Sequence, residues 1–124
     1  MGNRIVWVDI PVADLDRAIR FYSALLGEPV TREGGPGFAF GLLPHADGEA
    51  AGCLYVPASD GNAPSAVGPL VYLDATNRLS QALEAASALG GRVLEPIQPI
   101  GGHGFRAVLL DSEGNRIALH APAL

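Results

Sequence analysis

The sequence predicts an α+β fold of two tandem βαβββ modules that form a curved mixed sheet with a cup-shaped site. Three observations support this prediction. The chain has 124 residues, of which 48% are hydrophobic and 17% charged, and this is enough for one compact core. Its 16 Gly and 10 Pro favour many short elements over a bundle of long helices. The apolar pattern of the first half also recurs in the second half, about 64 residues later.

The first module is expected over residues 4–58. An alternating apolar pattern at residues 5–10 predicts a strand. Asp14 is then placed to cap a helix whose apolar residues recur at helical spacing as far as Leu26, and Gly27 supplies a left-handed end. Three short strands split by glycines are predicted to follow, at residues 28–32, 37–43 and 51–56.

A linker rich in Ser, Gly, Asn and Pro is expected at residues 59–68, and the second module at residues 69–121. Residues 70–74 form a short apolar stretch, and a helical pattern then continues to Leu89 and stops at Gly90-Gly91. The remaining strands are predicted at residues 92–97, 105–110 and 116–120, with a turn at residues 111–115.

The sequences of the two modules can be aligned residue by residue. Leu15 and Ala18 of the first helix correspond to Leu79 and Ala82 of the second. The opening strands match Ile10 with Leu73, and the closing strands match Leu54 with Leu119, at offsets that differ by single residues as loop insertions would produce. The alternative is a chance similarity between two amphipathic helices, since apolar spacing is common.

Composition excludes several classes of function. Lys+Arg 8 against Asp+Glu 13 gives a net charge of −5 without any basic cluster, so no nucleic-acid partner is expected. No apolar run approaches the roughly 18 residues that a membrane span requires, and no membrane partner is expected. The N-terminal residues lack the apolar core of a signal peptide. The single cysteine, Cys53, fits a reducing compartment, so the expected location is cytoplasmic.

Three segments carry a family resemblance. Residues 8–22, the Gly90-Gly91-Arg92-Val93 run and residues 111–119 resemble corresponding segments of the vicinal oxygen chelate superfamily, which includes glyoxalase, bleomycin-resistance and extradiol dioxygenase relatives. The resemblance covers essentially the whole chain. It implies paired βαβββ modules, and usually a homodimer.

In metal-dependent members, the resemblance implies one metal ligand on the first and last strand of each module. The corresponding positions here are Trp7, Cys53, Leu70 and Ala118. Trp, Leu and Ala offer no lone pair to a divalent ion, so we expect no metal and no cofactor. A displaced site that uses Asp9, Cys53, His103 and His120 is the alternative.

Strand parity predicts the residues that line the cup. Ile5 and Asp9 share a face with Trp7, Tyr55 with Cys53, Tyr72 with Leu70, and Arg116 and His120 with Ala118. Arg106 joins them if Leu109 pairs with Ile117, because a slip of one residue would turn it to the other face. The predicted ligand-binding residues are Trp7, Asp9, Tyr55, Tyr72, His103, Arg106 and His120.

This lining favours metal-free binding of a small, partly aromatic or apolar molecule. Trp7 and the tyrosines could stack on a planar ligand, and Arg106 could pair with a carboxylate. One alternative is a metal-independent enzyme that uses Asp9, His120 or Tyr72 for proton transfer. Others are a metal-dependent lyase or dioxygenase with displaced ligands, and an interaction module without a ligand. Several candidates also have purely structural interpretations: Trp7 as a packing residue, Asp9 as an ion-pair partner of Arg106, and His120 as a structural histidine.

Overall fold

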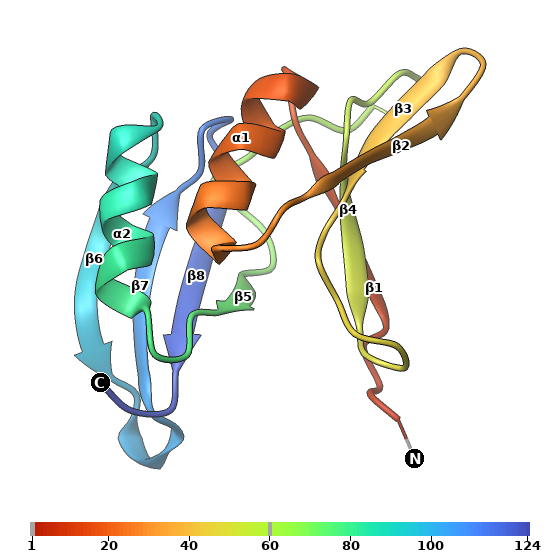
Figure 1. The fold of residues 1–124 in the computed structure, drawn as a ribbon. Coiled ribbons are helices and arrows are strands. Elements are labelled where there is room, and N and C mark those ends of the chain that lie inside the picture. The colour runs from red at the N-terminus through yellow and green to blue at the C-terminus, as the bar shows by residue number, and fades with distance from the viewer. Residues whose placement is uncertain (1, 60) are drawn as a thin grey trace.

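The computed structural model describes residues 2–59 and 61–124. Met1, at the start of the predicted domain, and Asp60, in the predicted linker, lie outside the described residues. The predicted α+β class is confirmed, and each half of the chain forms its own four-stranded sheet with one helix (Figure 1). Neither helix among the described residues is long and apolar enough to cross a membrane.

Sheet A is built by the first half of the chain. Its strands, in spatial order, are β1 (Trp7–Pro11), β4 (Ala51–Tyr55), β3 (Phe38–Leu42) and β2 (Thr31–Gly35). Helix α1 (Leu15–Leu26) covers one face. The Asp14 carboxylate accepts a hydrogen bond from the Arg17 N–H, and Gly27 ends the helix at φ 71°, so both predicted caps are confirmed.

Sheet B is built by the second half. Its strands, in spatial order, are β5 (Val71–Asp74), β8 (Arg116–Ala121), β7 (Phe105–Leu110) and β6 (Arg92–Pro99). Helix α2 (Leu79–Ala88) covers one face, and a short 3-10 turn, η1 (Gly101–His103), connects β6 to β7.

The register of the sheets confirms the internal repeat. In each sheet the first strand pairs in parallel with the last, which gives Ile10 opposite Leu54 in sheet A and Leu73 opposite Leu119 in sheet B. These are the residues that the sequence matched between the two halves. The strand order is also the same in both sheets.

One core joins the two modules. Buried side chains of both helices and both sheets form a single apolar cluster, in which Leu25 of α1 and Ala82 of α2 are completely buried. Helix α1 packs on sheet A and also on α2, so it lies between the modules (Figure 1). The helix-facing sides of both sheets therefore share this core, and each sheet keeps one open face turned away from it.

The largest correction concerns the second strand. It was predicted at residues 28–32, but β2 runs from Thr31 to Gly35, and the other strand boundaries agree within about two residues. The glycines suggested a turn, whereas Gly34 continues the hairpin opposite Ala39. A Cβ at Gly34 would stand 2.3 Å from the Phe38 carbonyl oxygen, so the close approach of β3 requires glycine there.

Candidate functional site

The open face of sheet A carries a cluster of aromatic side chains. Trp7 and Asp9 lie on this face of β1, because Val8 and Ile10 point toward the core. The register places Asp9 opposite Cys53, and Tyr55 opposite Phe40. Phe38 is 62% exposed, and its ring lies parallel to that of Phe40 with 6.5 Å between the centroids. Trp7 is 48% exposed, and a group of partly exposed aromatic rings on one sheet face is typical of a binding surface.

Asp9 is the polar centre of this face. Its Oδ1 accepts a hydrogen bond from the Trp7 indole Nε1–H at 2.6 Å and another from the Cys53 thiol at 3.3 Å. Burial raises the pKa of Cys53 to about 11, and the hydrogen bond to the Asp9 carboxylate adds to this shift. Cys53 therefore stays a protonated donor at neutral pH, and the indole hydrogen bond fixes the orientation of Trp7.

The open face of sheet B is dominated by Arg106. Its Nη1 donates to the Tyr72 hydroxyl at 2.5 Å, and its Nη2 lies 3.4 Å from Glu95 Oε1. Tyr72 and Glu95 stand at the two ends of a row that includes Ala118 and Val108, both completely buried. The Arg106 side chain thus bridges this row and covers its apolar floor. The predicted pairing of Leu109 with Ile117 is confirmed, so Arg106 does face this side, next to His120.

His120 is tied to the loop that follows β6. Its Nε2 lies 2.6 Å from the His103 carbonyl oxygen, which can only accept, so Nε2 carries the proton and donates. In the neutral ring, Nδ1 then remains as an acceptor. The His103 ring itself makes no hydrogen bond that the described residues show, and this residue contributes through its backbone.

The predicted site residues fall into two groups, one on each sheet. Trp7, Asp9 and Tyr55 belong to sheet A, and the others to sheet B or its loop. A cavity of about 1020 Å³ lies between the modules and touches Trp7 and Tyr72 but none of the other predicted site residues. Asp9 and Arg106 do not pair with each other, because each is bound by side chains of its own sheet.

The residues present do not fit a divalent metal. No group of three or more His, Cys, Asp or Glu side chains converges within residues 2–59 and 61–124. Asp9 and Cys53 are neighbours, but the thiol is protonated and donates to the carboxylate. Their counterparts in sheet B are Tyr72 and Ala118, which add no carboxylate, thiolate or imidazole.

Sequence reasoning missed Phe38 and Phe40. The signal was available, since the two residues alternate with Ala39 in a predicted strand and therefore share a face. The strand register, which places Phe40 opposite Tyr55, could not be predicted from the sequence.

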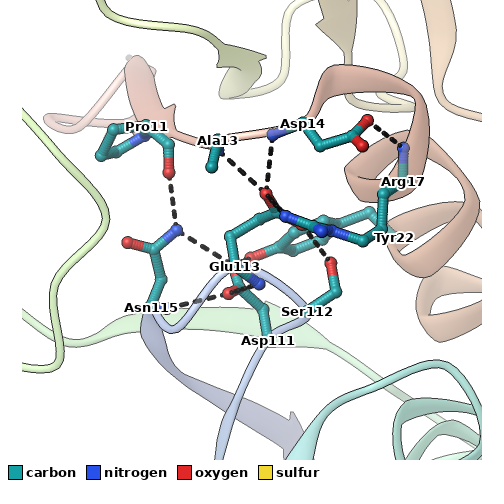
Figure 2. A network of polar contacts seen from close by, with 9 residues as sticks. All are labelled: Pro11, Ala13, Asp14, Arg17, Tyr22, Asp111, Ser112, Glu113 and Asn115. Atoms are coloured by element: carbon teal, nitrogen blue, oxygen red, sulfur yellow. Dashed lines mark hydrogen bonds and ion pairs between the residues drawn. The ribbon is translucent and has the colours of Figure 1, made fainter.

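A polar network that spans about 100 residues of sequence fixes the modules relative to each other (Figure 2). Glu113, in the turn between β7 and β8, accepts hydrogen bonds at 2.9 Å from the backbone N–H groups of Ala13 and Asp14. It also pairs with Arg17 Nε at 2.7 Å. A carboxylate of the second module thus binds the backbone directly before α1 and the Arg17 side chain in its first turn, near the positive end of the helix dipole.

Beneath Glu113, the buried Asp111 carboxylate completes this network (Figure 2). Its Oδ2 accepts a hydrogen bond from the Tyr22 hydroxyl at 2.5 Å, and Oδ1 accepts from the backbone N–H groups of Glu113 and Asn115. The Asn115 amide donates onward to the Pro11 carbonyl oxygen at 2.7 Å. We call Tyr22, Asp111, Glu113 and Asn115 the intermodule clasp.

Comparisons with known proteins agree with this architecture. A family model described as the glyoxalase/bleomycin resistance protein/dioxygenase superfamily matches residues 4–119. No curated protein matches the chain. A crystal structure of a glyoxalase/bleomycin resistance protein from Albidiferax ferrireducens T118 is 22% identical, with a TM-score of 0.76 over 96% of this chain and 98% of that chain.

Two further solved structures share the fold at lower identity. A glyoxalase-related enzyme from Fulvimarina pelagi is 13% identical, with a TM-score of 0.71 over 96% of this chain and 88% of that chain. A mutant of the genomically encoded fosfomycin resistance protein FosX from Listeria monocytogenes, complexed with Mn(II) and 1S,2S-dihydroxypropylphosphonic acid, is 16% identical. Its TM-score is 0.67 over 100% of this chain and 93% of that chain. At these identities the likeness shows the fold alone.

Proposed function

The chain belongs to the glyoxalase/bleomycin resistance protein/dioxygenase superfamily, and from this premise we propose that it binds a small, partly aromatic or apolar molecule without a metal. The observation that supports the proposal is the open face of sheet A. It presents the only Trp of the chain, one of three Tyr and two of four Phe, together with the Asp9 carboxylate. Side chains of this kind bind planar molecules by stacking, which adds about 0.5–1.5 kcal/mol per aromatic contact beyond area burial.

We further propose that the chain forms a homodimer. Strands β1 and β5 each pair with one neighbour only, so each leaves one edge open. Ile5 and Val6 are exposed directly before β1, and Tyr72 is 44% exposed on β5. Pairing the β1 edge of one copy with the β5 edge of another would cover these residues.

Trp7 fluorescence tests the binding proposal directly, because no other tryptophan contributes. We expect planar aromatic compounds to quench this fluorescence with saturation. Isothermal titration calorimetry should show binding weakened about tenfold or more in Trp7→Ala, as stacking and burial are lost. Leu89→Ala, at the exposed residue that follows α2, is the matched control and should bind normally. Equal affinity in Trp7→Ala and in the unaltered protein would contradict the proposal.

Light scattering tests the proposed homodimer. A particle of twice the 12.8 kDa chain mass is expected. Tyr72→Glu should shift it toward the monomer, because a charge would then be buried at the contact between edges. A stable monomer of the unaltered protein at micromolar concentration would count against the homodimer.

A further inference from the structure

The two open faces differ in charge. On sheet A, the register places two carboxylates on the aromatic face, Asp9 on β1 and Glu33 opposite Phe40 on β2. None of the Lys, Arg or His residues within the described strands of sheet A lies on this face, since Arg32 points to the other side and pairs there with Asp16 of α1. Sheet B instead carries Arg106, Arg116 and His120 on its open face, together with the carboxylates Asp74 and Glu95.

Asp9 has hydrogen-bond donors but no counter-ion. The ion pairs that the described residues form do not include it, and two of its donors, the indole of Trp7 and the thiol of Cys53, are neutral. Both donors bind Oδ1, and the residue remains exposed. A negative charge is thus held beside the Trp7 ring, on a face where ligand binding would displace water.

The Trp7 ring is also held in one orientation and is accessible for stacking. Its hydrogen bond to Asp9 orients the indole before any ligand arrives, while 48% of the residue stays exposed. An aromatic face attracts cations through its negative π surface, and this attraction grows when the cation is desolvated. The neighbouring carboxylate acts in the same direction, so the two effects select the same type of molecule.

We propose that the ligand of this face is a planar aromatic molecule with a positive charge, such as an N-alkylated heteroaromatic ring. Its ring lies on Trp7 and its charge lies against Asp9. The inference rests on the proposed function and names the chemical class of the ligand. Sheet B is a poorer place for such a cation, because Arg106 covers its apolar floor and adds a positive charge.

Three probes of one shape test the inference: N-methylacridinium, neutral acridine and anthracene-9-carboxylate, titrated at pH 8 by calorimetry. We expect the cation to bind about tenfold more tightly than acridine, and the anion to bind most weakly. Asp9→Asn keeps an oxygen that can accept from the Trp7 indole but removes the charge. It should lower the affinity for N-methylacridinium about tenfold and change the affinity for acridine less than about twofold. Glu84→Gln removes the same charge from the exposed side of α2 and should leave all three affinities unchanged.

The outcomes separate this inference from the proposed function. If acridine binds but the three probes show no preference for positive charge, the ligand class is wrong and the binding function stands. The same holds if Asp9→Asn keeps the full preference for the cation. If none of the probes binds the folded protein, both proposals are overturned.

Discussion

Replacing Glu113 by Gln should destabilise the protein at neutral pH. The Glu113 side chain is completely buried, and its two oxygens together accept hydrogen bonds from the Ala13 and Asp14 backbone, from Arg17 and from Ser112. A glutamine has nearly the same shape but only one accepting oxygen and no charge. It would lose the ion pair and set an NH₂ group against donors.

The pKa of Glu113 gives the magnitude. Burial alone would raise this pKa, but hydrogen bonds from Arg17, the Asp14 backbone, Ser112 and the Ala13 backbone outweigh it and lower the pKa from 4.5 to about 2. Taken in full, that shift corresponds to about 3 kcal/mol of stability. Arg17 is 45% exposed, so solvent screening reduces the expected loss to about 1–2 kcal/mol. For a chain of this length, Tm should fall by roughly 3–8 °C.

The pH dependence follows from the lowered pKa. A carboxylate whose pKa is lower in the folded state contributes its full stability above the unfolded value of 4.5 and loses it as pH falls toward 2. Urea denaturation of the unaltered protein and of Glu113→Gln should therefore differ most near pH 7, and the two should converge as pH falls below about 4. Glu84→Gln controls for the loss of one charge. A difference that is absent at pH 7, or that persists unchanged at pH 3, would refute this reasoning.

Three further predictions concern single side chains. Tyr22→Phe removes the hydroxyl that donates to the buried Asp111, and the free energy of unfolding measured with urea should fall by about 1–3 kcal/mol. An unchanged free energy would mean that water replaces the hydroxyl without loss. Gly91→Ala would set a Cβ 2.8 Å from a ring carbon of Phe21 and from the Leu110 backbone oxygen, so Tm should fall. An unchanged Tm would show that the backbone adjusts. Burial raises the Cys53 pKa to about 11, so alkylation of Cys53 by iodoacetamide at pH 8 should be at least about 50-fold slower in the folded protein than in urea. Similar rates in the two conditions would show an accessible thiolate.

Sequence patterns predicted the elements that local chemistry determines. The cap of α1 by Asp14 and its end at Gly27 need only neighbouring residues, and both are present. The period of two along each strand predicted which side chains share a face, and the register of β7 and β8 places Arg106 and His120 side by side. The internal repeat supplied the matching order of the two sheets.

Contacts between distant segments were not predictable in the same way. Glu113 reads in sequence as a turn residue, and only the tertiary structure carries its carboxylate to the first turn of α1. The partners of Asp9 and Arg106 lie within their own sheets, and the pairing of non-adjacent strands that brings Cys53 to Asp9 and Tyr72 to Arg106 cannot be read from local sequence. No pattern of apolar residues specifies which side of each helix meets the other module.

The intermodule clasp has a consequence for the independence of the two repeats. The backbone N–H group of Asp14, just before the first helix, binds Glu113 of the other half, and the buried hydroxyl of Tyr22 donates to Asp111 there. We therefore expect fragments cut within the linker to stay largely unstructured apart and to regain helical circular dichroism when mixed in equal amounts. Duplication would then have been followed by a dependence of the first copy on the second.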